Sequence, residues 1–216
     1  MNIDIDRIKK IRNIAPEVTI VAATKTVEPD TIRGLVDLGI TDIGENRTTE
    51  LQRKKAKLKD LDIDWHFLGS LQSNKVKSII NEIDWLHSLD RESLAKEIQN
   101  YRLGKLKCFV EVHISPEPSK AGLSVEMVVD FCKNMVKYDK IVIVGLMGMA
   151  PLTKDQDRIK YSFQKLYDLR TQIRNLQLPH APCEFLSMGM TNDYEIAIAL
   201  GATHLRLGRI LFRNEE

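Results

Sequence analysis

The chain has 216 residues, 43% hydrophobic and 29% charged, which is the balance of a globular protein that buries one sizeable core. A net charge of +2 creates no broad basic field, so nucleic acid is not an expected partner. The opening residues, MNIDIDRIKK, carry charges throughout and do not resemble a signal peptide. The longest uncharged apolar run, residues 141–152, falls well short of the ~20 residues of a membrane helix.

Three cysteines, Cys108, Cys132 and Cys183, lie far apart in the sequence. An odd number of cysteines without CxxC spacing is typical of reduced thiols and predicts a cytoplasmic protein. No group of histidine, cysteine and carboxylate residues has the spacing of metal ligands, so we expect no bound metal. The composition shows no break along the chain, which predicts a single domain over residues 1–216.

Short apolar runs rich in β-branched residues alternate with helical patterns along the chain. Eight runs predict strands, at residues 18–24, 41–43, 63–68, 83–87, 106–113, 141–147, 183–186 and 203–207. Helices are predicted at about residues 3–14, from Pro29 to Gly39, after a cap at Asp90, over residues 155–176, and after a capping box of Asn192 and Glu195. The run RKKAKLKD, residues 53–60, predicts a solvated helix face rather than a nucleic-acid-binding patch.

Eight strands that alternate with helices predict an α/β fold, a single (β/α)8 TIM barrel preceded by one extra N-terminal helix. The alternative is an open doubly wound sheet, which so many strands in a chain of this length make less favourable. In such a barrel the functional site forms at the C-terminal ends of the strands. Glycine and polar residues gather at these ends, in GEN, GSLQSNK, HISPEPSKAG, GLMGMAP, SMGMTND and LGR.

The first predicted strand, in VTIVAATK, leads into Lys25. An amine at the mouth of a barrel is expected to be partly desolvated, which lowers the pKa of a lysine and leaves a neutral amine that attacks aldehydes. Taken alone, Lys25 is better explained as a residue that simply ends a strand. A second feature on the same rim is needed to give it a chemical role.

Two glycine turns at the same rim supply that feature. SMGMTNDYEIAIAL passes from a strand through Gly189 to a helix, and THLRLGRILF repeats the arrangement with Gly208 at the turn. Backbone N–H groups at such turns bind phosphate, and the loops after strands seven and eight often form the phosphate site of a barrel. A lysine that faces a phosphate site is what pyridoxal 5′-phosphate (PLP) requires.

The motifs VAATKT, GEN, WHFLGSLQSNK, SPEPSKAG, GLMGMAP, LSMGMTND and RLG occur in this order. In them the chain resembles the pyridoxal-phosphate homeostasis proteins, single-barrel relatives of the N-terminal barrel of alanine racemase. The resemblance covers about residues 3–212. It implies a PLP barrel of fold type III that acts in intracellular PLP homeostasis and holds the cofactor as a Schiff base on Lys25. PLP and related B6 vitamers would be its ligands, and PLP-dependent apoenzymes would be candidate recipients.

The resemblance also implies which residues surround the cofactor. Asn46 would lie beside it, and Arg206 would face the pyridine nitrogen, where a guanidinium keeps that nitrogen neutral and makes the ring a weaker electron sink. The phosphate would be bound by Ser187, Gly189, Thr191, Gly208 and Arg209. Arg209 stands where the family usually has threonine. Either it pairs with the phosphate in place of the hydroxyl, which we expect, or it points away and leaves only backbone donors.

Other polar residues have plainer interpretations. His66, His87 and His204 are interpreted as histidines with satisfied hydrogen bonds in the core or at the rim, rather than as acid–base groups. Lys75 and Lys120 are predicted on the functional rim, either as solvated loop lysines or as part of a basic mouth that attracts phosphorylated vitamers.

Three functions stay open at this point. The first is a monomeric PLP carrier without catalytic residues or substantial turnover, which we expect. The second is a PLP-dependent amino-acid racemase, which needs acid–base groups on both faces of the ring; alanine racemase obtains one of them from a partner subunit arranged by a second domain, and this sequence has no second domain. The third is a Schiff-base aldolase that acts on a phosphorylated sugar without any cofactor.

Overall fold

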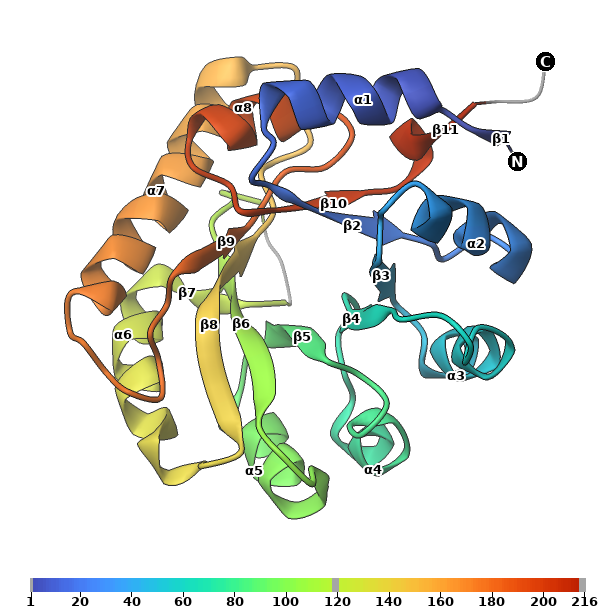
Figure 1. Ribbon diagram of the computed structural model, residues 1–216. Helices are drawn as coiled ribbons and strands as arrows, with labels where there is room; N and C mark the ends of the chain where they lie inside the picture. Colours follow the sequence, from blue (N-terminus) through green and yellow to red (C-terminus); the bar gives the residue numbers. More distant parts are fainter. Residues whose placement is uncertain (1, 118–120, 214–216) are drawn as a thin grey trace.

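The computed structural model describes residues 2–117 and 121–213. Eight parallel strands form a closed barrel with helices packed around it (Figure 1). Around the ring lie β2 (Thr19–Ala23), β3 (Asp42–Glu45), β4 (Asp64–Phe67), β5 (Trp85–Leu89), β6 (Leu106–His113), β8 (Ile141–Gly148), β9 (Phe185–Ser187) and β10 (His204–Leu207). Pairing of β10 with β2 closes the ring. The structure confirms the predicted barrel over the open sheet, together with all eight predicted strands.

The helices form the outer layer of the barrel (Figure 1). They are α1 (Ile5–Ile14), α2 (Pro29–Asp37), α3 (Thr48–Lys57), α4 (Val76–Ile79), α5 (Glu92–Tyr101), α6 (Val125–Asn134), α7 (Gln156–Arg174) and α8 (Tyr194–Ala199), with 3-10 turns η1 (Ser73–Lys75), η2 (Met135–Lys137) and η3 (Arg209–Leu211). Three two-residue strands were not predicted: β7 (Leu123–Ser124), which extends the sheet beside β6, and β1 (Asn2–Ile3), which pairs antiparallel with β11 (Phe212–Arg213). Among the described residues, no helix combines the length and the apolar character needed to cross a membrane.

Local sequence signals account for several helix ends. The Asp4 carboxylate accepts a hydrogen bond from the N–H of Arg7 at the start of α1, and the Asp155 carboxylate accepts two backbone hydrogen bonds at the start of α7. Pro29 occupies the first turn of α2. Gly39 follows that helix with φ +77°, a conformation that favours glycine.

Two predicted caps are wrong. Arg91, not Asp90, is the N-cap of α5, because the Asp90 carboxylate accepts a hydrogen bond from the Arg91 guanidinium at 2.6 Å instead of reaching the helix backbone. The capping box before α8 does not form either. Its N-cap residue is Asp193, whose carboxylate turns back to accept a hydrogen bond from the N–H of Met190 at 2.6 Å.

The interior of the barrel is filled by aromatic rings and imidazoles. Trp85 and Phe109 stack with their ring centroids 5.9 Å apart, and His66 stacks on Trp85 at 5.2 Å. Phe109 is fully buried, and burial of such a side chain contributes about 1.5–3 kcal/mol relative to leaving it in water. The centre of the barrel is therefore packed with side chains.

One charged residue of the predicted solvated helix face is buried, so that prediction is wrong at Lys54. The Lys54 side chain is fully buried, pairs with the Glu45 carboxylate at 2.5 Å and donates a hydrogen bond to the carbonyl of Thr24 at 2.6 Å. The Thr24 hydroxyl donates to the same Glu45 oxygen at 2.6 Å. These contacts join α3 to the C-terminal ends of β2 and β3, next to Lys25 and Asn46.

Candidate functional site

Lys25 lies just beyond the C-terminal end of β2, at the rim of the barrel. Val21 of this strand pairs in register with Arg206 of β10, and side chains in register on parallel strands point to the same face. This register places Val21 and Arg206 on the inner face, and the strand ends at Ala23, so Lys25 lies in the turn that follows. The side chain is exposed and lines a cavity of about 310 Å³ that Asn46 also lines.

The expected partial desolvation of Lys25 is therefore wrong for this structure. The strand ends at Ala23, so the lysine extends beyond the packed interior into the mouth of the barrel. Its position agrees with the prediction, whereas its surroundings are more open than the sequence suggested.

Asn46 follows β3 at the same rim and is also exposed. The turn after β4 packs on its backbone, because a side chain at Gly69 would place a Cβ 2.5 Å from the Asn46 carbonyl oxygen. Glycine at position 69 thus lets the two loops meet. Lys75 is exposed and lines a neighbouring cavity of about 350 Å³ together with Asn46, while Lys120 lies outside the described residues.

Arg206 lies inside the barrel, with only 7% of the residue exposed. Its guanidinium donates hydrogen bonds to the carbonyl of Ser187 at 2.6 Å, to the Ser187 hydroxyl at 2.7 Å and to the carbonyl of Gly148 at 3.1 Å. Burial lowers the pKa of Arg206 to about 10, and Asp193 and Glu111 oppose this shift. The guanidinium forms no ion pair with a carboxylate in residues 2–117 or 121–213.

The Ser187 hydroxyl also lies inside the barrel. Its oxygen is 2.7 Å from Arg206 Nη1 and 2.9 Å from Nδ1 of His87. The structure therefore brings Ser187 together with Arg206 at the end of β9, before the glycine turn begins. Whether it also binds phosphate, as the family resemblance implies, stays a prediction.

The first predicted phosphate turn follows β9. Gly189 has φ +93°, and a Cβ there would lie 2.6 Å from the Cβ of Ala197 and 2.8 Å from Cδ2 of Leu205, so the position requires glycine on both grounds. Thr191 is partly buried in the same turn, before α8. The side chain of Met190, in the same turn, is exposed.

The second turn follows β10. Gly208 precedes η3, and a Cβ at this position would meet only Ala23, at ordinary contact distances. The side chain of Arg209 is exposed and makes no hydrogen bond or ion pair within the described part of the chain. It is therefore free to reach a ligand, and its predicted contact with phosphate stays a prediction.

Glu111 is a candidate functional residue that sequence reasoning missed. It pairs in register with Met147, which pairs with Ser187, so all three lie on the inner face of the barrel. Glu111 is only 6% exposed, and burial together with Asp90 raises the pKa of its carboxyl to about 7, against the opposing effect of Arg206. Its carboxylate has no hydrogen bond within the described residues.

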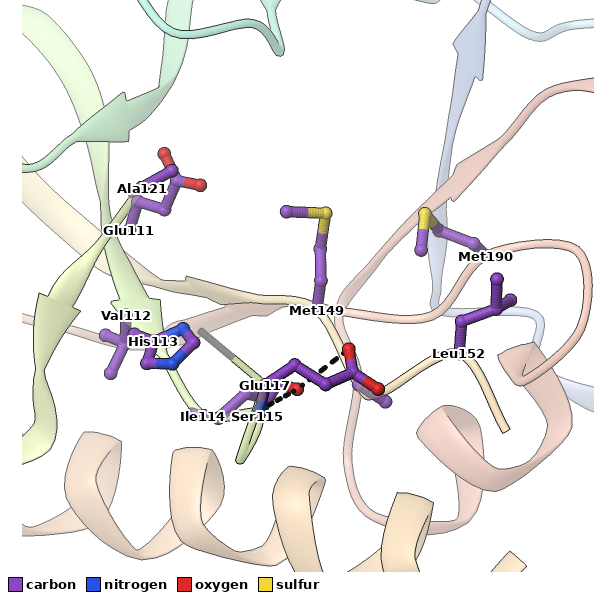
Figure 2. Close-up of a pocket in the computed structure, with 11 residues that line it drawn as sticks. Glu111, Val112, His113, Ile114, Ser115, Glu117, Ala121, Met149, Leu152 and Met190 are labelled. Carbon is purple, nitrogen blue, oxygen red and sulfur yellow. Dashed lines mark hydrogen bonds between the residues drawn. The ribbon is translucent and has the colours of Figure 1, made fainter. Parts of the chain in front are cut away.

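Glu111 lines a cavity of about 340 Å³ next to the candidate site. Figure 2 shows Met149 and Met190 at this pocket on two different segments, with Leu152 beside Met190. The only hint in the sequence was a carboxylate inside the apolar run CFVEVH. In a strand buried on both faces, that pattern does not tell which face is which.

The three histidines of the interior have the hydrogen bonds that were predicted. Nδ1 of His66 lies 2.9 Å from Nε2 of His87, and Nδ1 of His204 lies 2.9 Å from the Thr203 hydroxyl. Burial lowers the pKa of His87 well below its usual range and that of His204 to about 3. In the part of the chain that the structure describes, no cluster of three or more potential ligands could hold a metal ion.

A closed parallel barrel with a lysine after its first ring strand, an inward arginine on its last and glycine turns after the last two defines the class of alanine-racemase-like barrels. Residues 5–215 match the family described as alanine racemase, N-terminal domain. The chain is 37% identical over 199 residues to the pyridoxal phosphate homeostasis protein of Aquifex aeolicus, covering 89% of this chain and 85% of that protein. It is 34% identical to the protein of that name from Pseudomonas aeruginosa, over 90% of this chain and 84% of the relative. The chain belongs to the pyridoxal phosphate homeostasis protein family.

Solved structures agree with this assignment. PipY of Synechococcus elongatus, determined without PLP, superposes with a TM-score of 0.89 at 33% identity and covers 96% of this chain and 99% of its own. PipY with PLP bound gives a TM-score of 0.86 at 30% identity over 96% of this chain and 99% of its own. Alanine racemase from Corynebacterium glutamicum has a TM-score of 0.78 at 12% identity, over 99% of this chain and 63% of its own, which shows the shared fold.

Proposed function

We propose that this protein binds PLP and holds it, covalently and reversibly, on the amine of Lys25 as part of PLP homeostasis. The observation that carries the proposal is the placement of Lys25 after the C-terminal end of β2, the strand that pairs with the Arg206 strand β10, with the glycine turns at Gly189 and Gly208 on the same rim. The PLP-bound structure of PipY supports it.

The residues at the mouth fit this cofactor chemically. When bound, PLP supplies an aldehyde and an electron-accepting ring. The exposed amine of Lys25 can bind the aldehyde, Asn46 can orient the ring, and the buried guanidinium of Arg206 can donate to the pyridine nitrogen. The phosphate would be held by Gly189, Thr191, Gly208 and Arg209, to which the family resemblance adds Ser187.

We further propose that the protein is a carrier and not an enzyme with substantial turnover. A guanidinium at the pyridine nitrogen is a donor that keeps this nitrogen unprotonated, which makes the ring a poor sink for the electrons of a carbanion. The exposure of Lys25 admits water, which weakens electrostatic stabilisation of charge at the mouth. We propose that the protein acts as a cytoplasmic monomer that stores PLP reversibly and passes it to apoenzymes.

Lys25 is tested by trapping. Borohydride makes the reversible linkage between an aldehyde and an amine permanent, so peptide mapping of the reduced PLP-bound protein should find the adduct on Lys25. Lys25→Ala should lose the adduct and the visible absorption band, while the exposed-lysine control Lys75→Ala should keep both. An adduct on Lys75 or Lys120 instead would refute the assignment. A protein that binds a sugar phosphate covalently but shows no visible band with PLP would favour the aldolase.

A further inference from the structure

An unbroken line of hydrogen bonds crosses the interior of the barrel. Oδ1 of Asp42 lies 3.0 Å from Nε2 of His66, whose Nδ1 lies 2.9 Å from Nε2 of His87. Nδ1 of His87 lies 2.9 Å from the hydroxyl of Ser187, which lies 2.7 Å from the guanidinium of Arg206. The line contains one residue each from β3, β4, β5, β9 and β10.

The two ends of this line face opposite ends of the barrel. Asp42 begins β3, its side chain is 23% exposed, and it lines a cavity of about 330 Å³ at the N-terminal rim. Both imidazoles are fully buried. Arg206 lies at the other end, near the mouth that holds Lys25. The line thus connects solvent at one rim to the candidate cofactor site at the other.

The chemistry of the two ends fixes a direction for the whole line. A carboxylate only accepts hydrogen bonds and a guanidinium only donates them. If each imidazole carries one proton, His66 must donate from Nε2 to Asp42 and accept at Nδ1 from His87. His87 then accepts at Nδ1 from the Ser187 hydroxyl, which accepts from Arg206. Every hydrogen bond points from Arg206 towards Asp42.

We propose that Asp42, His66, His87 and Ser187 form a directed hydrogen-bond relay whose role is to position Arg206. In this arrangement the single proton of the Ser187 hydroxyl is committed to His87. Ser187 therefore serves the guanidinium and does not donate to the phosphate. That the positioned guanidinium acts on the cofactor ring rests on the proposed function; the relay itself does not.

The electrostatics of the interior are consistent with this direction. Arg206 is buried without an ion pair in the described residues, so a carboxylate joined to it through aligned hydrogen bonds offsets part of the cost of burial. Burial also lowers the pKa of His87 well below its usual range, with contributions from His66, Arg206 and His204. Besides these groups, Lys107 and Glu111 of β6 face the same interior, and Asp193 lies close enough to oppose the lowering of the Arg206 pKa.

If His66 carried a second proton, the hydrogen bonds from His66 through His87 to Ser187 would run in the opposite direction. His66 would then donate from Nδ1 to His87, and His87 would donate from Nδ1 to Ser187. The hydroxyl of Ser187 would accept from both His87 and Arg206, and its own proton would become free for a phosphate. The tautomer of His87 therefore distinguishes the two arrangements.

The first test uses the protein without cofactor, labelled with ¹⁵N in its histidines. Ring ¹⁵N chemical shifts between about pH 6.5 and 8.5 should show both His66 and His87 as neutral rings protonated at Nε2. A proton on Nδ1 of His87 would overturn the proposal. Because no PLP is present, this outcome does not depend on whether the protein binds the cofactor.

The second test changes Asp42 at one end of the relay and measures PLP binding at the other end. Asp42→Leu removes the acceptor, Asp42→Asn keeps an acceptor oxygen without charge, and Asp64→Leu changes the residue that pairs in register with Asp42 at the same rim. Asp42→Leu should abolish the single His66 tautomer and shift the absorption maximum of bound PLP. It should also weaken PLP binding about twofold to thirtyfold, the range of coupling through a network. Asp42→Asn should largely preserve the tautomers, and Asp64→Leu should match the wild type.

Equal tautomers, absorption maxima and PLP affinities in Asp42→Leu and Asp64→Leu would overturn the relay. If none of the proteins binds PLP, the proposed function fails, while the tautomers still decide whether the relay exists. Urea unfolding of each variant establishes that it is folded at the conditions of the measurement.

Discussion

Glu111 places a carboxyl with a pKa of about 7 inside the barrel, raised from an ordinary value of 4.5 chiefly by burial. The folded protein therefore holds a proton that the unfolded chain has released between these values. Folding stability is fully present below about pH 4.5, falls as the pH rises through the pKa of the folded state, and is constant above it. The free energy of unfolding below about pH 4.5 exceeds that above the folded-state pKa by at most about 3 kcal/mol from this group.

Replacing Glu111 with glutamine should remove this dependence. Urea unfolding of the wild type and of Glu111→Gln at several pH values should give similar stabilities near pH 4 and a growing advantage for the variant up to about pH 8. If the unfolding free energies of the two proteins changed in parallel with pH over this range, the Glu111 carboxyl would titrate in the folded protein as it does in the unfolded chain.

Arg209 offers a second test at the level of one residue. A charge-assisted contact with phosphate is worth about 1.5–3 kcal/mol, so Arg209→Ala should weaken PLP binding about tenfold to a hundredfold. Arg174→Ala changes an exposed arginine at the end of α7 and should leave the affinity unchanged. An unaltered dissociation constant for Arg209→Ala would show that the backbone of the two turns suffices.

At the level of elements, α3 is attached to the sheet by one buried ion pair. Removing Lys54 leaves the Glu45 carboxylate buried without its partner, and Glu45 Oε2 already lacks a hydrogen bond among the described residues. Lys54→Met should therefore cost about 3–5 kcal/mol of unfolding free energy. Lys57→Met, on the exposed side of the same helix, should change it by less than about 0.5 kcal/mol.

A double variant separates lost packing from an unpaired charge. In Lys54→Met with Glu45→Leu no charge stays buried, and most of the stability should return. Chemical unfolding of the single and double variants measures this. Equal losses in both would assign the role of Lys54 to packing alone.

The elements were largely predictable because each ring strand is a short apolar run bounded by turn residues. The partners of individual side chains were not predictable from the sequence. Lysine in a run such as RKKAKLKD is the ordinary sign of a solvated face, and the burial of Lys54 depends on Glu45 being placed under α3. The relay escaped prediction for a similar reason, since His87 and Ser187 meet only when the barrel closes.

At the level of the whole molecule, the site at the mouth was predictable and its accessory groups were less so. The position of Lys25 follows from the rule that barrel sites form at the C-terminal ends of the strands. Glu111 lies in a strand buried on both faces, where periodicity does not reveal which side chains point inwards. The inward position of Glu111 becomes visible only from the register between strands.

The proposed lack of turnover concerns the whole molecule, because racemisation needs groups on both faces of the cofactor. Chiral analysis of alanine after long incubation with the PLP-bound protein should show no substantial conversion, with Lys25→Ala as the control. The same incubations should yield no transamination or decarboxylation products. Racemisation at about 1 s⁻¹ or faster that disappears in Lys25→Ala would identify the protein as a racemase.

The ring closes where β10 pairs with β2, with His204 in register with Thr19. This pairing cannot form until the ribosome has synthesised β10. The strand that precedes Lys25 is synthesised early, yet the strand that carries Arg206 is among the last to emerge. Until then β2 lacks one neighbour and presents an unpaired edge, the kind of surface on which chaperones act. A nascent chain therefore has the lysine but not the site, and the cofactor can be taken up only after translation has passed β10.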